Sequence, residues 1–209
     1  MLDFVALDFE TANKYKNSAC SLAVITVENG QITKKAYSLI KPPFMSFDPE
    51  CIEIHGIEPK EVLNEKTFDQ LWPAIYENHL KGKIMIAHNA KFDMNVLRAT
   101  LDYYKIPWPE LEYACTVKIS RAVWPDLVNH KLNTMGAYLG VEFKHHYALD
   151  DAETCAKVAI EAARLKEANS LPELLAKIGV PLEPFIDEKN KAAQAALHKK
   201  PEPEQMSFF

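Results

Sequence analysis

The sequence predicts an α/β domain in which a mixed five-stranded sheet is flanked by helices. Strand-like segments open the chain, and helical segments then alternate with short apolar strands, an order typical of one sheet covered by helices. Asn29-Gly30 lies between two runs with strand patterns, which indicates a tight hairpin. A chain of 209 residues is long enough to bury the core of one such domain and to carry an appendage.

Five segments have the apolar or β-branched composition of strands. They are residues 2–9, 20–27, 31–40, 83–87 and 113–117. The first is mostly apolar, as expected of a strand buried on both faces. Because the second and third flank the hairpin signal, three antiparallel strands are expected at the start of the chain.

Six segments have the spacing or the end signals of helices. They are residues 67–80, 91–104, 118–123, 132–139, 150–168 and 171–178. In the second, Phe92, Val96, Leu97 and Leu101 are expected on one face, which this helix would bury. The stretch 44–66, before the first helix, is expected to be a long connection.

Apolar content falls after residue 180. Residues 1–180 are therefore expected to form the domain, 181–204 a flexible linker that is at most partly helical, and 205–209 a C-terminal peptide. The run Pro201-Glu-Pro-Glu204 in the middle segment is typical of linkers.

Several absences favour a cytoplasmic protein. No apolar run approaches the roughly 20 residues of a membrane span, so no membrane partner is expected. The N-terminus lacks a basic region and is not a secretory signal. The four cysteines are dispersed without a Cys-x-x-Cys pair, which favours reduced thiols and argues against a zinc site.

Asp8 and Glu10 form the first candidate site pair. They are two residues apart near the end of the first predicted strand, so their side chains point to the same face. Two carboxylates in an otherwise apolar strand are costly to bury without a cation or a proton. The pair is therefore either a metal site or an ordinary pair of acids at a strand edge.

Asp93 is the second candidate and follows the predicted strand 83–87 and His88-Asn89. It is expected in the first turn of the next helix, where the helix dipole favours an anion. Asp93 is thus explained either as a site residue or as a helix-start acid, and Asn89 is an equal candidate for the helix cap.

The third candidate is a histidine and an aspartate five residues apart, in two registers. His145 precedes Asp150 by five residues, and His146 precedes Asp151 by five. Spacing leaves both pairs open. Helix phase places Asp151 on the more buried side, together with Cys155.

Together the three stretches resemble the DEDD-type 3′–5′ exonuclease superfamily in its histidine subclass, DEDDh. The resemblance covers most of residues 1–175. The first motif, Asp-x-Glu, matches residues 8–10, and the second, often His-Asn-x-x-Phe-Asp, matches residues 88–93. The third, His-x-Ala-x-x-Asp, matches residues 146–151, and Ala148 selects His146 and Asp151 over the other register.

Within the superfamily the chain is most similar to the proofreading epsilon subunit of bacterial DNA polymerase III and its stand-alone relatives. Ile54-His-Gly-Ile57 also resembles a stretch of that group. The resemblance implies an RNase H-like fold, which agrees with three antiparallel strands followed by α/β units.

The resemblance also implies hydrolysis of a phosphodiester with two Mg²⁺ or Mn²⁺ ions, which oxygen ligands favour. Asp8 would bridge both ions, and Glu10 and Asp151 would complete the site that holds the attacking water. Asp93 would support the second ion through water. His146 would accept the proton of that water. The alternative is that His146 is an ordinary solvated histidine in a loop. With two cations bound, the formal net charge of -5 is largely offset and no longer argues against a nucleic-acid partner.

Residues in or beside the matched stretches are expected to touch the 3′-terminal nucleotide. They are Thr11, Ala12, His55, Asn89 and Phe92. Four cations are candidates for phosphate contacts, although a solvated surface position explains each equally well. They are Lys14, Lys16, Lys118 and Arg121.

The C-terminal peptide Gln205-Met206-Ser207-Phe208-Phe209 resembles the bacterial sliding-clamp binding motif. Met206 and Phe208 replace the commonest leucines and stay apolar. A preceding linker of roughly 24 residues would span about 27 Å, so the peptide would dock while the domain samples DNA nearby. The plain alternative is that two terminal aromatic residues occur by chance.

The sequence therefore predicts a metal-dependent 3′–5′ exodeoxyribonuclease that acts on single-stranded or frayed DNA 3′ ends in proofreading or repair. A proofreading role would require a DNA polymerase as a partner. One alternative is a 3′–5′ exoribonuclease, because the same catalytic set serves both substrates. The other is a non-catalytic RNase H-like module that binds a polymerase. The preference for DNA rests mainly on the C-terminal peptide.

Overall fold

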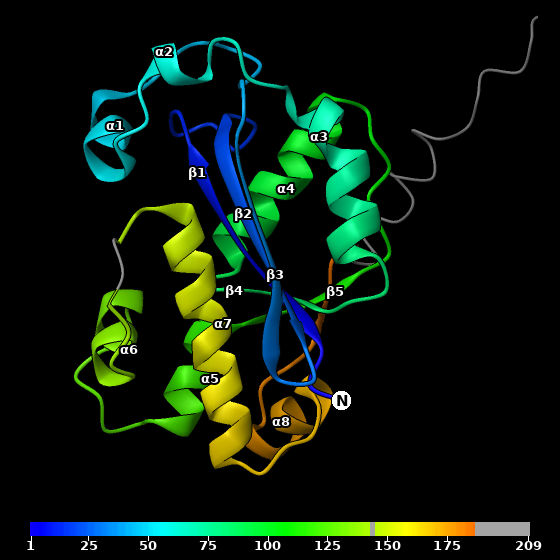
Figure 1. The fold of residues 1–209 in the computed structure, drawn as a ribbon, viewed down its shortest axis with the longest axis vertical. Coiled ribbons are helices and arrows are strands. Elements are labelled where there is room, and N and C mark those ends of the chain that lie inside the picture. The colour runs from blue at the N-terminus through cyan, green and yellow to red at the C-terminus, as the bar shows by residue number, and fades with distance from the viewer. Residues whose placement is uncertain (143–144, 187–209) are drawn as a thin grey trace, which may run out of the picture.

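The structure is a computed structural model, and it describes residues 1–142 and 145–186. A sheet in the strand order β3-β2-β1-β4-β5-β6 forms its centre, with helices packed on it (Figure 1). The strands are β1 (Phe4–Thr11), β2 (Ala19–Glu28), β3 (Gln31–Leu39), β4 (Met85–Ala87), β5 (Glu112–Cys115) and β6 (Glu183–Pro184). The helices are α1 (Pro49–His55), α2 (Pro59–Val62), α3 (Phe68–Ile75), the π-helix η1 (Tyr76–Leu80), α4 (Lys91–Tyr103), α5 (Thr116–Val123), α6 (Leu132–Tyr138), α7 (Ala148–Leu165) and α8 (Leu171–Ile178). The predicted α/β class is confirmed.

The sheet is mixed, as predicted, but it has six strands and not five. β1, β2 and β3 are antiparallel, whereas β4 runs parallel to both β1 and β5. The additional strand is β6, which pairs antiparallel with β5 through Glu183 and Pro184. It is two residues long and contains a proline, which is tolerated at a sheet edge. A segment this short carries no recognisable strand pattern.

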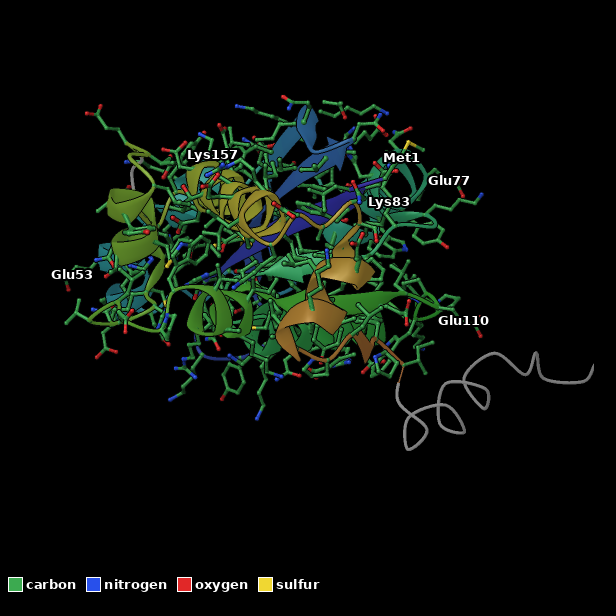
Figure 2. All side chains as sticks on the ribbon, turned by 90° about the horizontal axis from the view of Figure 1, so that it is seen from below. Met1, Glu53, Glu77, Lys83, Glu110 and Lys157 are labelled. Carbon is green, nitrogen blue, oxygen red and sulfur yellow. The ribbon has the colours of Figure 1, made fainter. Side chains whose placement is uncertain are left out.

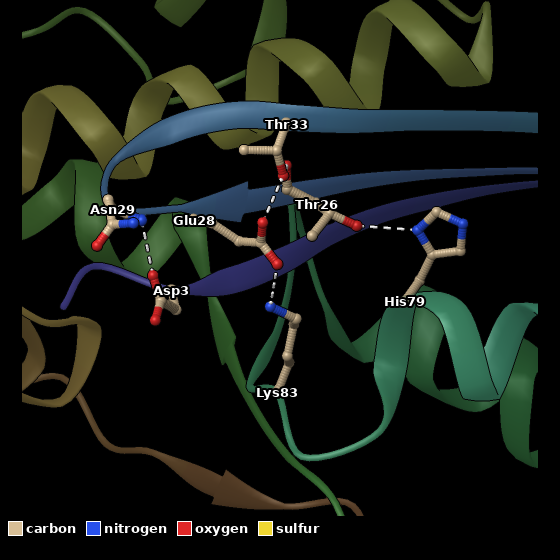
Figure 3. Close-up of polar contacts among 7 residues, drawn as sticks. All are labelled: Asp3, Thr26, Glu28, Asn29, Thr33, His79 and Lys83. Atoms are coloured by element: carbon tan, nitrogen blue, oxygen red, sulfur yellow. Dashed lines mark hydrogen bonds and ion pairs between the residues drawn. The ribbon is translucent and has the colours of Figure 1, made fainter.

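The predicted hairpin between β2 and β3 is present. Asn29 and Gly30 both have positive φ, at 53° and 74°, as a two-residue hairpin turn of this kind requires. Figure 3 shows the polar contacts around this turn. Asp3 accepts a hydrogen bond from the Asn29 backbone N–H at 2.7 Å, and Glu28 pairs with Lys83 at 2.9 Å. These contacts tie the turn to the start of β1 and to the loop before β4.

Side chains of β1 alternate between two hydrophobic cores. Phe4 and Ala6 pack with the helices α5 to α8, and Val5 and Leu7 pack with α3 and α4. This two-residue period explains why the strand reads as a continuous apolar run. It also directs Asp8, two residues beyond Ala6, toward the layer that contains α7.

Two expected elements differ in the structure. The connection expected over residues 44–66 contains α1 and α2, and its sequence does carry helix signals, since Pro49 begins α1 and Gly56 ends it with a φ of 78°. The helix expected over residues 67–80 widens into η1 after Ile75. Pro73 lies just before this change and removes one backbone donor from the helical ladder.

The packed domain extends beyond the expected boundary at residue 180. Phe185 is fully buried, and its backbone N–H donates to the Leu111 carbonyl at 2.8 Å. The guanidinium of Arg98 donates to the Phe185 carbonyl at 2.6 Å and 3.1 Å. The rest of the predicted linker and the peptide 205–209 lie outside the described residues.

Charged side chains cover the outside of the domain. Figure 2 shows Glu53, Glu77 and Glu110 extending away from the ribbon, and all three are exposed. Among the helices of the described residues, none combines the length and the apolar character needed to cross a membrane.

Candidate active site

The predicted carboxylates meet at one edge of the sheet. Asp8 and Glu10 lie near the end of β1, and Asp93 lies in the first turn of α4, which follows the parallel strand β4. Asp151 lies in the first turn of α7, which packs across β1, β2 and β3 (Figure 1). Because β1 and β4 are parallel, their carboxyl ends share this edge, and α7 brings its first turn to the same place.

Three of the four carboxylates converge on one point. Asp8, Glu10 and Asp151 each offer an oxygen atom, and these atoms all lie within 4.8 Å of one another. Asp93 joins the group from the side, where its Oδ1 accepts a hydrogen bond from the Phe9 backbone N–H at 3.1 Å. Asp93 and Asp151 retain only 2% and 3% of their exposure. The structure thus brings together all four acids from three segments of the chain.

Burial and mutual repulsion raise the pKa values of these acids. Burial, and then the charges of Asp151 and Asp93, raises the pKa of Glu10 to about 8. Burial raises the pKa of Asp93 to about 7, against backbone hydrogen bonds that lower it. Burial, and then the neighbouring acids, raises the pKa of Asp8 well above its usual range. Carboxylates in this state bind a proton or a cation.

This donor set fits divalent cations. Clustered carboxylate oxygens are the ligands that Mg²⁺ and Mn²⁺ prefer. Asp8, Glu10 and Asp151 are the residues that would hold a cation between them, with Asp93 beside them. A bound cation would offset the repulsion that raises the pKa values, which is the physical reason for placing these acids together.

Both candidate histidines lie beside Asp151. Nδ1 of His145 is 3.1 Å from Asp151 Oδ1, and the His146 backbone N–H donates to Asp151 Oδ2 at 2.9 Å. The two imidazole rings stack with centroids 3.8 Å apart. Burial, and then the charge of His145, lowers the pKa of His146. The motif selected His146, and its role as the base stays a prediction, because the structure places the His145 ring against the carboxylate, whereas His146 reaches it through its backbone N–H.

A pocket of about 820 Å³ opens over these acids. One wall comes from the β1–β2 loop and α1, and it includes Lys14, Lys16 and Ile54. The other comes from α5 and the segment before α6, and it includes Arg121 and Lys131. The site therefore combines an acidic floor with a cationic rim, which suits a substrate that carries phosphates.

Four of the five predicted nucleotide contacts line this pocket. They are Thr11, His55, Asn89 and Phe92. Ala12 does not line the pocket, because its side chain is fully buried in a small core with Cys20 and Ile57, and its contact with a nucleotide stays a prediction. The pairing of β1 with β2 shifts register between Glu10 and Thr11, so the alternation of side chains does not carry on to Ala12.

Three of the four candidate cations also line the pocket. Lys14, Lys16 and Arg121 do so, and the Lys16 ammonium lies 4.3 Å from the centre of the Phe92 ring. Lys118 does not, because its ammonium pairs with Glu183 at 2.5 Å. Glu183 belongs to β6, the strand that the sequence pattern did not reveal.

His55 is held firmly at the pocket wall. Its Nδ1 accepts a hydrogen bond from the Ile57 backbone N–H at 2.9 Å, so the proton of a neutral ring sits on Nε2. Nε2 then donates to the Thr11 carbonyl at 3.2 Å. These two contacts fix the ring in one tautomer and one orientation.

Several pocket residues were not predicted from the sequence. They are Asn13, Cys51, His88, Val117, Asn129, His130, Lys131 and Leu132. The motif at residues 88–93 contained His88, but spacing alone assigned it no contact. Residues 129–132 belong to no matched stretch, so only the fold brings them to the site.

Sequence comparison with known proteins agrees with this geometry. The sequence profile of the exonuclease family RNase_T matches residues 5–159. The PolC-type DNA polymerase III of Thermotoga maritima is 29% identical over 181 residues, which is 85% of this chain and 12% of that protein. The 3′-5′ exonuclease DinG of Bacillus subtilis is 29% identical over 173 residues, 81% of this chain and 18% of that protein. The chain thus spans less than a fifth of these relatives.

Solved structures share the fold. Exonuclease X in complex with 5′ overhanging duplex DNA has a TM-score of 0.68 and 22% identity, covering 86% of this chain and 100% of that one. The nuclease domain of 3′hExo, a DEDDh family member bound to rAMP, has a TM-score of 0.68 and 15% identity, covering 87% of this chain and 96% of that one. The RNase H-like fold expected from the sequence is confirmed. The chain belongs to the RNase_T exonuclease family.

Proposed function

We propose that this protein is a metal-dependent 3′–5′ exonuclease that removes nucleotides from DNA 3′ ends with two Mg²⁺ or Mn²⁺ ions. The observation that carries the proposal is the convergence of Asp8, Glu10 and Asp151 within 4.8 Å, beside buried Asp93. Gathering buried carboxylates in this way costs stability unless a proton or a cation offsets their repulsion. A non-catalytic binding module would have no need of the arrangement.

Each residue has a defined part in the proposed reaction. Asp8, Glu10, Asp93 and Asp151 hold the two cations, which when bound stabilise charge on the attacking and leaving oxygens. An imidazole nitrogen of His146 takes the proton from the attacking water. Its lowered pKa keeps the imidazole neutral, and therefore able to accept this proton, at neutral pH.

We assign DNA as the substrate and replication proofreading or repair as the setting. Two sequence relatives support this assignment by their names, a DNA polymerase III and a 3′-5′ exonuclease. A polymerase is therefore the proposed protein partner, in a cytoplasmic setting. The second candidate is a 3′–5′ exoribonuclease, because one structural neighbour is bound to rAMP and another recognises the 3′ end of a histone mRNA stem-loop.

Digestion of labelled oligonucleotides tests the proposal. We expect the protein to shorten single-stranded DNA from its 3′ end only with Mg²⁺ or Mn²⁺, and RNA of the same sequence more slowly. Asp151→Asn is expected to lower turnover by at least 100-fold, since it removes a ligand charge. Asp150→Asn, one position away, is the matched control and is expected to cut like the parent. Cleavage by Asp151→Asn at the parent rate would reject the assignment, and faster cleavage of RNA would favour the second candidate.

We also propose that the C-terminal peptide binds a sliding clamp, with the residues after 186 acting as the tether. Residues Gln205 to Phe209 lie outside the described residues, so the support is their sequence alone. Deletion of residues 205–209 is expected to abolish clamp binding in a surface-binding assay and to leave cleavage of short oligonucleotides unchanged. Equal clamp affinity after the deletion would exclude the peptide as the anchor.

A further inference from the structure

We propose that residues 129–132 form a wall that binds the phosphates of the substrate strand, and that His88 is the positioning residue that fixes this wall. The proposal rests on the proposed function of the same pocket. All four residues of this segment, called here the 129–132 wall, line the pocket across from the β1–β2 loop. They end the connection from α5 to α6, with Leu132 beginning α6, and they belong to none of the catalytic motifs.

Lys131 in the wall and Arg121 on α5 are cations that the described part of the protein does not pair with an acid. Lys131 and Arg121 both line the pocket and are exposed, and neither forms an ion pair within residues 1–142 and 145–186. Lys118, on the same helix as Arg121, is instead neutralised by Glu183. Cations left unpaired at the rim of an acidic pocket are suited to bind the phosphates that approach the acids.

The backbone of the wall is held in one conformation. Asn129 Oδ1 accepts hydrogen bonds from the Lys131 backbone N–H at 3.0 Å and from the Thr134 hydroxyl at 2.7 Å. The side chain of Leu132 is buried, with 5% exposure. The backbone of Lys131, just before α6, is therefore fixed where the residue lines the pocket.

His88 anchors the wall to the body of the domain. Its Nε2 lies 2.9 Å from the His130 carbonyl oxygen, and its Nδ1 lies 2.9 Å from the Thr116 hydroxyl. A carbonyl only accepts, so Nε2 carries the proton and donates it. Nδ1 then accepts from the hydroxyl of Thr116, which begins α5. The ring thus joins the end of β4, the start of α5 and the wall.

This anchor is expected to stay neutral at neutral pH. Burial lowers the pKa of His88 to about 4. The ring stays neutral above that pH and keeps the tautomer that its two partners require. A neutral histidine with both ring nitrogens hydrogen-bonded is suited to fix the position of the wall. It has no free nitrogen for proton transfer.

Two substitutions at position 88 separate positioning from mere folding. The Gln side-chain amide reaches the place of Nε2 and still donates to the His130 carbonyl, whereas the Asn amide reaches only the place of Nδ1. We expect His88→Gln to bind a fluorescent single-stranded DNA oligonucleotide like the parent. His88→Asn is expected to bind it about tenfold more weakly, since the Lys131–phosphate contact is lost. Equal binding by the two variants, with equal melting temperatures, would overturn the role of His88.

A double-mutant cycle tests whether His88 acts through the wall. Lys131→Ala is expected to weaken binding about tenfold and to lower the salt slope by about 0.7, the value for one phosphate contact on a single strand. Adding His88→Asn to Lys131→Ala is expected to change neither quantity further. Lys14→Ala, on the opposite wall, is the control and is expected to add its effect to that of His88→Asn. Additive effects of His88→Asn and Lys131→Ala would refute the proposal.

The outcome is separable from the proposed nuclease activity. Binding is measured by anisotropy in Ca²⁺, a hard cation that oxygen ligands also hold, so it requires no turnover. Cleavage by the parent is measured separately in Mg²⁺. If the parent does not cleave but the His88 and Lys131 variants bind DNA as predicted, only the nuclease proposal is rejected. If the parent cleaves but the two substitutions have additive effects on binding, only the proposal for the 129–132 wall is rejected.

Discussion

Glu10 shows how its surroundings change the chemistry of a single residue. As an exposed side chain it would be ionised at pH 7. In the structure, burial and the charges of Asp151 and Asp93 raise its pKa to about 8, so in the metal-free protein it holds a proton at neutral pH. Spacing showed that Glu10 and Asp8 share a face, and the matched motifs named Asp93 and Asp151, but only the structure brings the four acids together. The residue is therefore prepared to exchange its proton for a metal ion.

The two stacked histidines lead to a prediction at the same scale. His146→Ala is expected to lower kcat by about 100-fold, the usual contribution of a general base, and to flatten the acid limb of the pH–rate profile. In the parent, that limb is expected to have its midpoint below the ordinary histidine pKa, because burial and His145 lower the pKa of His146. His145→Ala is the matched control and is expected to retain the limb. Steady-state kinetics between pH 5 and pH 9 would measure both, and loss of the limb only in His145→Ala would transfer the role to His145.

β6 shows how a small element completes the fold. It adds a short edge strand to β5 and leads into Phe185, which packs against the Trp108 ring with centroids 5.7 Å apart. Its Glu183 also pairs with Lys118 and accepts a hydrogen bond from the Tyr113 hydroxyl at 2.9 Å. An apparent linker thus contributes to the core, to the sheet and to the neutralisation of one cation.

Truncation tests the contribution of this element. A chain that ends at residue 186 is expected to melt like the full chain. A chain that ends at residue 180 loses Phe185 and β6, and its free energy of unfolding is expected to fall by about 3–5 kcal/mol, as for removal of a buried phenylalanine. Phe185→Ala in the full chain is expected to account for most of that loss. Urea unfolding would measure these differences, and equal stability of the two truncated chains would place the boundary at residue 180.

At the scale of the whole molecule, the candidate site is expected to make folding depend on metal and pH. The carboxylates come from β1, α4 and α7, so they meet only in the folded protein. Folding without metal raises their pKa values above those of the unfolded chain. The protonated carboxylates contribute fully to the free energy of unfolding below their pKa values in the unfolded chain, near pH 4. This contribution is lost as the pH rises through their pKa values in the folded protein, about 7 for Asp93 and about 8 for Glu10.

Thermal melting should reveal this dependence. The metal-free protein is expected to melt at a progressively lower temperature as the pH rises from about 5 to 8.5. Mg²⁺ is expected to raise the melting temperature more at pH 8 than at pH 6, because fewer protons compete for the carboxylates. At 100 times the dissociation constant the gain is about 2.7 kcal/mol. Asp8→Asn is expected to remove most of this gain, and an equal response of parent and variant to Mg²⁺ would contradict a metal site here.

Local sequence determined the features that depend on neighbours in the chain. Asn29-Gly30 specified the hairpin, because both positions require positive φ. Ser170 and Gly179 specified the ends of α8, because one caps its first turn and the other adopts the left-handed conformation after its last. Spacing within a strand or a helix made the carboxylates candidates, and the resemblance to the DEDDh motifs selected the four.

Only the tertiary structure decided the features that depend on distant segments. Ala12 faces a small core, Lys118 is neutralised by Glu183, and His145 shares Asp151 with His146. The 129–132 wall lies at the pocket, and His88, some 42 residues earlier, bonds to its His130 carbonyl. No local pattern records such contacts, because they form between segments that meet only when the sheet and its helices pack together.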